Sequence, residues 1–86
     1  MGAQESIHTA LTISTSIDRH TGELRKCTNA ISSKTGHVRK VASGTRSGDI
    51  AVRLLDGATG TINKSITVLE NASSQLKAYA QKIQNS

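Results

Sequence analysis

The chain has 86 residues, which is the size of one small domain over residues 1–86. Its single cysteine excludes an internal disulfide, and one tyrosine with no proline argues against a β-sandwich or barrel. The formal net charge of +5 would suit an acidic protein, nucleic acid or an anionic membrane surface. There is no run of 18 apolar residues, so we expect no membrane insertion.

The first predicted element is an amphipathic helix over about residues 6–41. Apolar residues recur there every seven positions, and a second, less regular set lies three residues after them. A period of seven is typical of helices that pack as in a coiled coil. The recurring residues are Ala10, Ile17, Leu24, Ile31 and Val38, and the companion positions are Ile13, His20, Cys27, Lys34 and Val41.

A connection over about residues 42–48 follows, where glycines and hydroxyl residues interrupt the apolar pattern. Gly44 is suited to the left-handed conformation that ends many helices. Ser47 or Asp49 can cap the next helix. Because so short a connection makes consecutive helices antiparallel neighbours, these features predict a hairpin.

The second predicted helix covers about residues 49–84 and has a more regular period of seven. Its apolar line is Leu55, Ile62, Leu69, Leu76 and Ile83, with companion positions Ala51, Ala58, Ser65, Ala72 and Tyr79, widened by Ile66 and Ala80. The predicted fold class is therefore all-α, an antiparallel two-helix hairpin with coiled-coil-like packing.

Glycines inside both predicted helices cost about 1 kcal/mol each relative to alanine. They are Gly22, Gly36, Gly57 and Gly60. One interpretation is that they merely soften the helices. The other is that Gly57 and Gly60 allow a close approach between helices.

No group of residues indicates catalysis. Cys27 and His20 lie seven positions apart, roughly 10 Å along a helix, too far for a nucleophile and its base. We interpret Cys27 as a small core residue, His20 as a polar residue at the core edge, and Lys34 as a side chain that extends to solvent. Histidines and carboxylates show no metal-ligand spacing. We therefore expect no enzyme, no cofactor, no metal and no small-molecule substrate.

Basic residues gather towards the connection. They are Lys34, Arg39, Lys40, Arg46 and Arg53. Contact with phosphates is one interpretation, but recognition motifs and stacking aromatics are missing. A solvated surface, or one that meets an acidic protein, is favoured over nucleic acid.

The chain resembles the small helical-hairpin proteins of type VII secretion systems, the Esx or WXG-motif superfamily. The resemblance rests on length, a glycine-containing central loop, and an N-terminus without a Sec-type signal peptide. The Ser-Gly-rich segment 42–51, followed by Leu54 and Leu55, is most similar to the Gram-positive subgroup that accompanies LXG toxins. Two features depart from the family: there is no tryptophan, and Ile83 stands four residues after Tyr79, where the family's export signal has an acid.

The resemblance implies a targeting or chaperone-like protein of the bacterial cytoplasm that binds by helix–helix association. Its partner would be the helical N-terminal domain of a toxin or a second Esx-like chain, in a homo- or heterodimer. Such a member would accompany a protein that carries the full export signal, whether or not the member is secreted as well. The expected interaction residues are Ile7, Leu11, Ile50, Leu54, Ile66, Val68, Tyr79 and Ile83.

Two alternative functions remain open at this point. One is a basic, helical nucleic-acid-binding protein, which would bind with a steep salt dependence. The other is a self-assembling subunit like the helical-hairpin needle proteins of other secretion systems.

Overall fold

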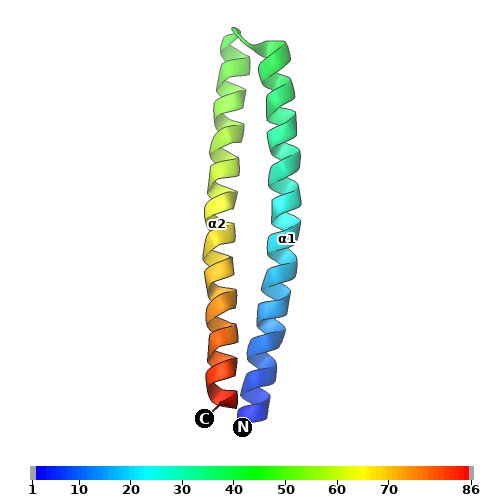
Figure 1. Ribbon diagram of the computed structural model, residues 1–86. Coiled ribbons are helices and arrows are strands. Elements are labelled where there is room, and N and C mark those ends of the chain that lie inside the picture. Colours follow the sequence, from blue (N-terminus) through cyan, green and yellow to red (C-terminus); the bar gives the residue numbers. More distant parts are fainter. Residues whose placement is uncertain (1, 86) are drawn as a thin grey trace.

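The computed structural model describes residues 2–85 as two long helices packed side by side (Figure 1). Helix α1 spans Ala3–Ala42 and helix α2 spans Arg46–Gln84. The molecule is a rod with extents of 61 × 17 × 14 Å, and α1 begins at the same end of the rod at which α2 finishes. The predicted all-α, antiparallel hairpin is confirmed.

The connection between the helices consists of residues 43–45 and is shorter than the predicted 42–48. Gly44 has a φ of 87°, the left-handed conformation expected of it. The Thr45 hydroxyl accepts a hydrogen bond from the Gly48 backbone N–H at 3.0 Å and so caps α2. The prediction of Ser47 or Asp49 as the cap is wrong, because α2 begins at Arg46, before both of them.

Beside this connection, Gly48 of α2 packs closely against the end of α1 and against the connection itself. A Cβ placed on Gly48 would lie 2.4 Å from the Ala42 carbonyl oxygen and 2.7 Å from the Thr45 hydroxyl. By contrast, a Cβ on Gly57 or Gly60 would meet no atom within 4 Å. The interpretation of Gly57 and Gly60 as sites of close approach is therefore wrong, and Gly48 takes that role.

The seam between the helices is centred on small side chains, many of them polar. We call this set the central line: Ser14, Thr21, Thr28 and Thr35 on α1, and Thr59, Ile66, Ser73 and Ala80 on α2. All are buried except Thr59, which is half-buried. The three central-line threonines of α1 each donate a hydrogen bond to a carbonyl of their own helix, as Thr21 does to Asp18 at 2.9 Å. Their hydroxyls are thus satisfied without a partner on α2.

The companion positions predicted for the seam lie elsewhere. On α1 they are all exposed: Ile13, His20, Cys27, Lys34 and Val41. On α2, Ala51 is half-buried and the others are exposed: Ala58, Ser65, Ala72 and Tyr79. The interpretation of Cys27 as a core residue is wrong for the same reason: the central line occupies the positions beside it.

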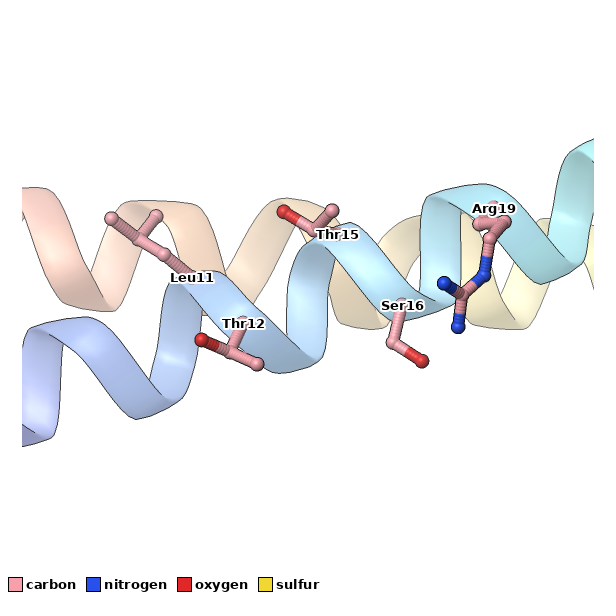
Figure 2. A pocket seen from close by; sticks show the side chains of 5 residues that line it. All are labelled: Leu11, Thr12, Thr15, Ser16 and Arg19. Atoms are coloured by element: carbon pink, nitrogen blue, oxygen red, sulfur yellow. The ribbon is translucent and has the colours of Figure 1, made fainter.

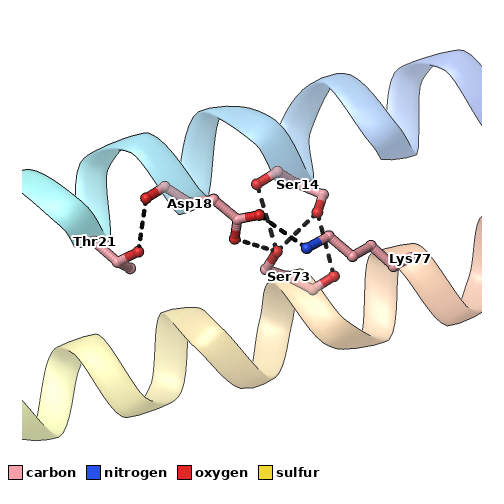
Figure 3. A network of polar contacts seen from close by, with 5 residues as sticks. All are labelled: Ser14, Asp18, Thr21, Ser73 and Lys77. Carbon is pink, nitrogen blue, oxygen red and sulfur yellow. Dashed lines mark hydrogen bonds and ion pairs between the residues drawn. The ribbon is translucent and has the colours of Figure 1, made fainter.

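One layer of the seam joins the helices through polar groups (Figure 3). The hydroxyl oxygens of Ser14 and Ser73 are 2.8 Å apart, and Ser14 is only 1% exposed. Ser73 also donates to the Asp18 carboxylate at 2.7 Å, and the Lys77 ammonium lies 2.9 Å from the other carboxylate oxygen. This layer ties a buried contact to an ion pair at the surface.

Ion pairs between the helices line one flank of the seam. They are Asp18 with Lys77, Arg25 with Glu70, and Arg39 with Asp56. Exposed pairs of this kind stabilise a fold only slightly. Their effect on register is larger, because sliding α2 by seven residues in one direction places Asp18 opposite Glu70. Sliding it in the other direction places Arg25 opposite Lys77. The first slip would also bring Arg39 opposite Asp49, but both slips pair like charges and leave fewer opposite-charge pairs than the three observed, so both are disfavoured.

Replacing Gly48 with alanine should destabilise the hairpin. The new methyl group meets backbone that cannot move aside, and overpacking of this kind costs about 1–3 kcal/mol. Gly57→Ala is the matched control, and its open surroundings predict a gain of up to about 1 kcal/mol. Urea denaturation followed by circular dichroism measures both. Equal stabilisation by the two substitutions would contradict the close approach at Gly48.

Acid should weaken the hairpin through Asp18. Hydrogen bonds from Lys77 and then Ser73 hold the pKa of this carboxyl below its ordinary value of 3.8. The folded state therefore favours ionised Asp18, and this stabilisation is complete well above pH 3.8 and is lost as pH falls through the folded-state pKa. Urea midpoints measured across this range should differ between the natural chain and Asp18→Asn above pH 3.8 and converge below it. A difference that persists unchanged into strong acid would contradict the assignment.

Candidate protein-interaction face

The seam divides the surface of the hairpin into a charged face and an apolar face. A helix turns about 100° per residue, so residues four positions after the central line lie about 40° to one side of it. Residues three positions after it lie about 60° to the other side. The ion pairs join residues of both helices that lie four positions after the central line. The residues three positions after the central line therefore lie on the opposite face in both helices.

Large aliphatic side chains occupy the positions three residues after the central line. They form a half-buried line: Ile17, Leu24, Ile31 and Val38 on α1, and Leu55, Ile62, Leu69 and Leu76 on α2. Small side chains on the central line fit wholly between the helices, whereas these larger ones extend beyond the seam. Two helices alone therefore leave them partly in water.

The exposed area of the chain supports the same conclusion. Among residues 2–85, the apolar side chains that are fully buried are Ala10, Ile66 and Ala80. The chain exposes 6300 Å², whereas a compact monomer of 9.1 kDa exposes about 4,900 Å². The excess of about 1,400 Å² exceeds the roughly 800 Å² that one partner contributes to a standard interface.

Beyond its half-buried line, α2 carries a further stripe, which we call the outer stripe. Its members follow one another at alternating spacings of three and four: Ala51, Leu54, Ala58, Thr61, Ser65, Val68, Ala72, Gln75 and Tyr79. Leu54 is 70% exposed, Val68 67% and Tyr79 50%. The stripe is centred about 130° around α2 from the central line. Spacings of three and four that alternate along a helix are the pattern of a helix-packing seam.

A hollow between the helices shows that both contribute to the apolar face. It lies towards the end of the rod where α1 begins, and it is lined by Ser6, Thr9, Ala10, Ile13, Leu76 and Tyr79. Ile13 and Tyr79 border it from opposite helices, although 66 positions separate them in the sequence. We define the apolar face as the half-buried line together with the outer stripe.

The residues predicted to bind a partner do not share one surface. Leu54, Val68 and Tyr79 lie on the outer stripe, and the exposed Ile50 borders it. Leu11 is exposed but lies four positions after Ile7, on the charged side. Ile7 and Ile83 are half-buried at the end of the seam.

Ile66 is the clearest correction among these predictions. It is 2% exposed, so a partner cannot reach it while the hairpin is closed. The sequence analysis assigned the alanines and Ser65 of the outer stripe to the seam, and so it did not predict that they belong to the surface. The signal that identifies them is their alternation with Leu54 and Val68, which lie one position before Leu55 and Leu69.

Another groove lies on the side of α1, lined by Leu11, Thr12, Thr15, Ser16 and Arg19 (Figure 2). Its side chains are exposed apart from Ser16, which is half-buried, so it is a shallow polar surface. Within residues 2–85, no three histidine, cysteine, aspartate or glutamate side chains are grouped as a metal site would require. Neither described helix is long and apolar enough to cross a bilayer.

No family model, curated protein or solved structure matches this chain.

Substitutions at Ile66 and Val68 should separate the seam from the outer stripe. Ile66→Ala removes a buried side chain and should lower the free energy of unfolding by about 2–5 kcal/mol. Val68→Ala, two positions away on the exposed stripe, should change it by no more than about 0.5 kcal/mol. Urea titrations of the two variants provide the comparison. Similar losses at both positions would show that the seam is assigned wrongly.

Proposed function

We propose that this chain is a helical binding protein associated with type VII secretion. It pairs through its apolar face with the helical N-terminal domain of an LXG-type toxin and acts as the toxin's targeting partner or chaperone. The resemblance of its sequence to Esx-like hairpins supplies the biological setting. The apolar face supplies the mechanism, which is burial of one helix against another.

The observation that carries this proposal is the outer stripe of α2 beside the half-buried line. Leu54 and Val68 are large, exposed and separated by small residues, which lets a neighbouring helix approach closely. Burial of apolar area contributes about 25 cal/mol per Å² before the costs of association are subtracted. An area of roughly 800 Å² on each partner is enough for a specific complex.

The proposal also accounts for the incomplete export signal. The resemblance implies that an acid should follow Tyr79 by four residues, and Ile83 holds that position instead. We infer that the complex is recognised for export, with the complete signal on the partner. Tyr79 is half exposed on the apolar face, next to the surface that the partner covers.

Co-expression with the helical domain of a toxin encoded beside this chain tests the proposal. The two proteins should co-purify, and Leu54→Gln with Val68→Gln should weaken binding at least about tenfold, because both positions lose buried apolar contact. Leu11→Gln is the matched control, since Leu11 is exposed on the charged side, and it should leave binding unchanged. Titration calorimetry measures the affinities. If the chain bound none of the helical proteins encoded beside it, that result would contradict the proposal.

A further inference from the structure

The charges around the apolar face are mostly basic. All three acids of α2 share the heptad position of Glu70, which lies four residues after Ile66 on the charged face: Asp49, Asp56 and Glu70. Asp56 and Glu70 are engaged there by Arg39 and Arg25. No acid of α2 borders the outer stripe. The cations beside the apolar face are Lys64, at the outer edge of α2, Lys82, three residues after Tyr79 on the line of the outer stripe, and Lys34, on the far side of the half-buried line of α1. One acid of α1, Glu23, also lies on this side, one position before Leu24.

From this arrangement we propose that the apolar face takes an amphipathic helix of another protein, one whose apolar stripe is bordered by glutamate or aspartate. The inference rests on the proposed function and adds the chemistry of the partner. Acidic side chains beside the partner's stripe would meet Lys34 and Lys64, and on the α2 side no acid of this chain competes for them. Complementary charges at the rim of an interface select the partner and speed its docking.

A second copy of the chain fits this face poorly. Helix α2 runs from Arg46 to Gln84, so Lys64 lies next to its midpoint at residue 65. In a parallel two-fold pairing of outer stripes, Lys64 would flank the seam and face Leu69 of the second molecule, five residues later. In an antiparallel pairing with full overlap, residues near the midpoint meet their own counterparts, which brings Lys64 close to Lys64. Either arrangement joins two molecules that each carry a net charge of +5.

Two designed peptides probe the inference directly. Each has roughly four heptads with leucine on its apolar stripe, and the flanking positions are all glutamate in one and all lysine in the other. Repulsion between flanking charges keeps each peptide from pairing with itself. Fluorescence anisotropy should show the glutamate peptide binding the full chain at least about tenfold more tightly, with the difference shrinking as salt is added.

Two variants with the same change in net charge locate the effect. Lys34→Gln with Lys64→Gln should reduce the preference to below about threefold. Arg19→Gln with Lys26→Gln, on the outer side of α1, should keep it. Circular dichroism and urea midpoints establish that both variants remain folded as hairpins.

Each other outcome overturns the inference in a distinguishable way. Equal binding of the two peptides, or equal effects of the two variants, removes the acidic partner and leaves the proposed function standing. Sedimentation at micromolar concentration that shows a dimer, dissolved by Leu54→Gln with Val68→Gln, assigns the face to a second copy. If neither peptide binds, the inference fails, and co-purification with the toxin domain decides the proposed function separately.

Discussion

The contact between Ser14 and Ser73 determines which surface this hairpin presents. It is buried, and Ser73 continues it to Asp18 and Lys77 at the edge of the seam. Once this layer is aligned, the charged side chains of the two helices meet on one flank. The opposite flank then receives the large aliphatic residues of both helices. A slip by one heptad would pair like charges and place Ser14 opposite Ile66 or Ala80 instead of Ser73.

The size of the side chains in the seam explains why the apolar face stays incomplete. Serine, threonine and alanine fill most of the central line, so little apolar volume is buried between the helices. Leucine and isoleucine lie beside this line and are covered on one side only. Hydrophobic burial is the main contribution to the stability of a fold. In this hairpin, much of the leucine and isoleucine surface would be buried only by a further helix. Stability and binding are therefore linked: a partner that covers this face also stabilises the hairpin.

The sequence was sufficient to predict the hairpin, because the period of seven and the glycine-containing connection are local features. It also identified the aliphatic lines through Leu24 and Ile62. The sequence analysis assigned the wrong neighbours of these aliphatic lines to the seam. Each aliphatic line is flanked on both sides by a line with the same period of seven, and only one of the two faces the other helix. On α1 the true companions are threonines, whose hydroxyls are satisfied within the helix, so polarity gave no sign of burial. On α2, Ala58 and Thr59 are adjacent, and only the pairing of two helices decides which of them faces inward. The ion pairs likewise depend on register and could not be read from either helix alone.

Disulfide trapping tests the register on which the apolar face depends. In a Cys27→Ser background, Ser14→Cys with Ser73→Cys should close an intramolecular disulfide rapidly, because the two hydroxyl oxygens of the natural residues are already in contact. Ser14→Cys with Ala80→Cys, displaced by two helical turns, should stay reduced under the same mild oxidation. If the second pair closed and the first did not, the helices would be aligned differently and the apolar face described above would not exist.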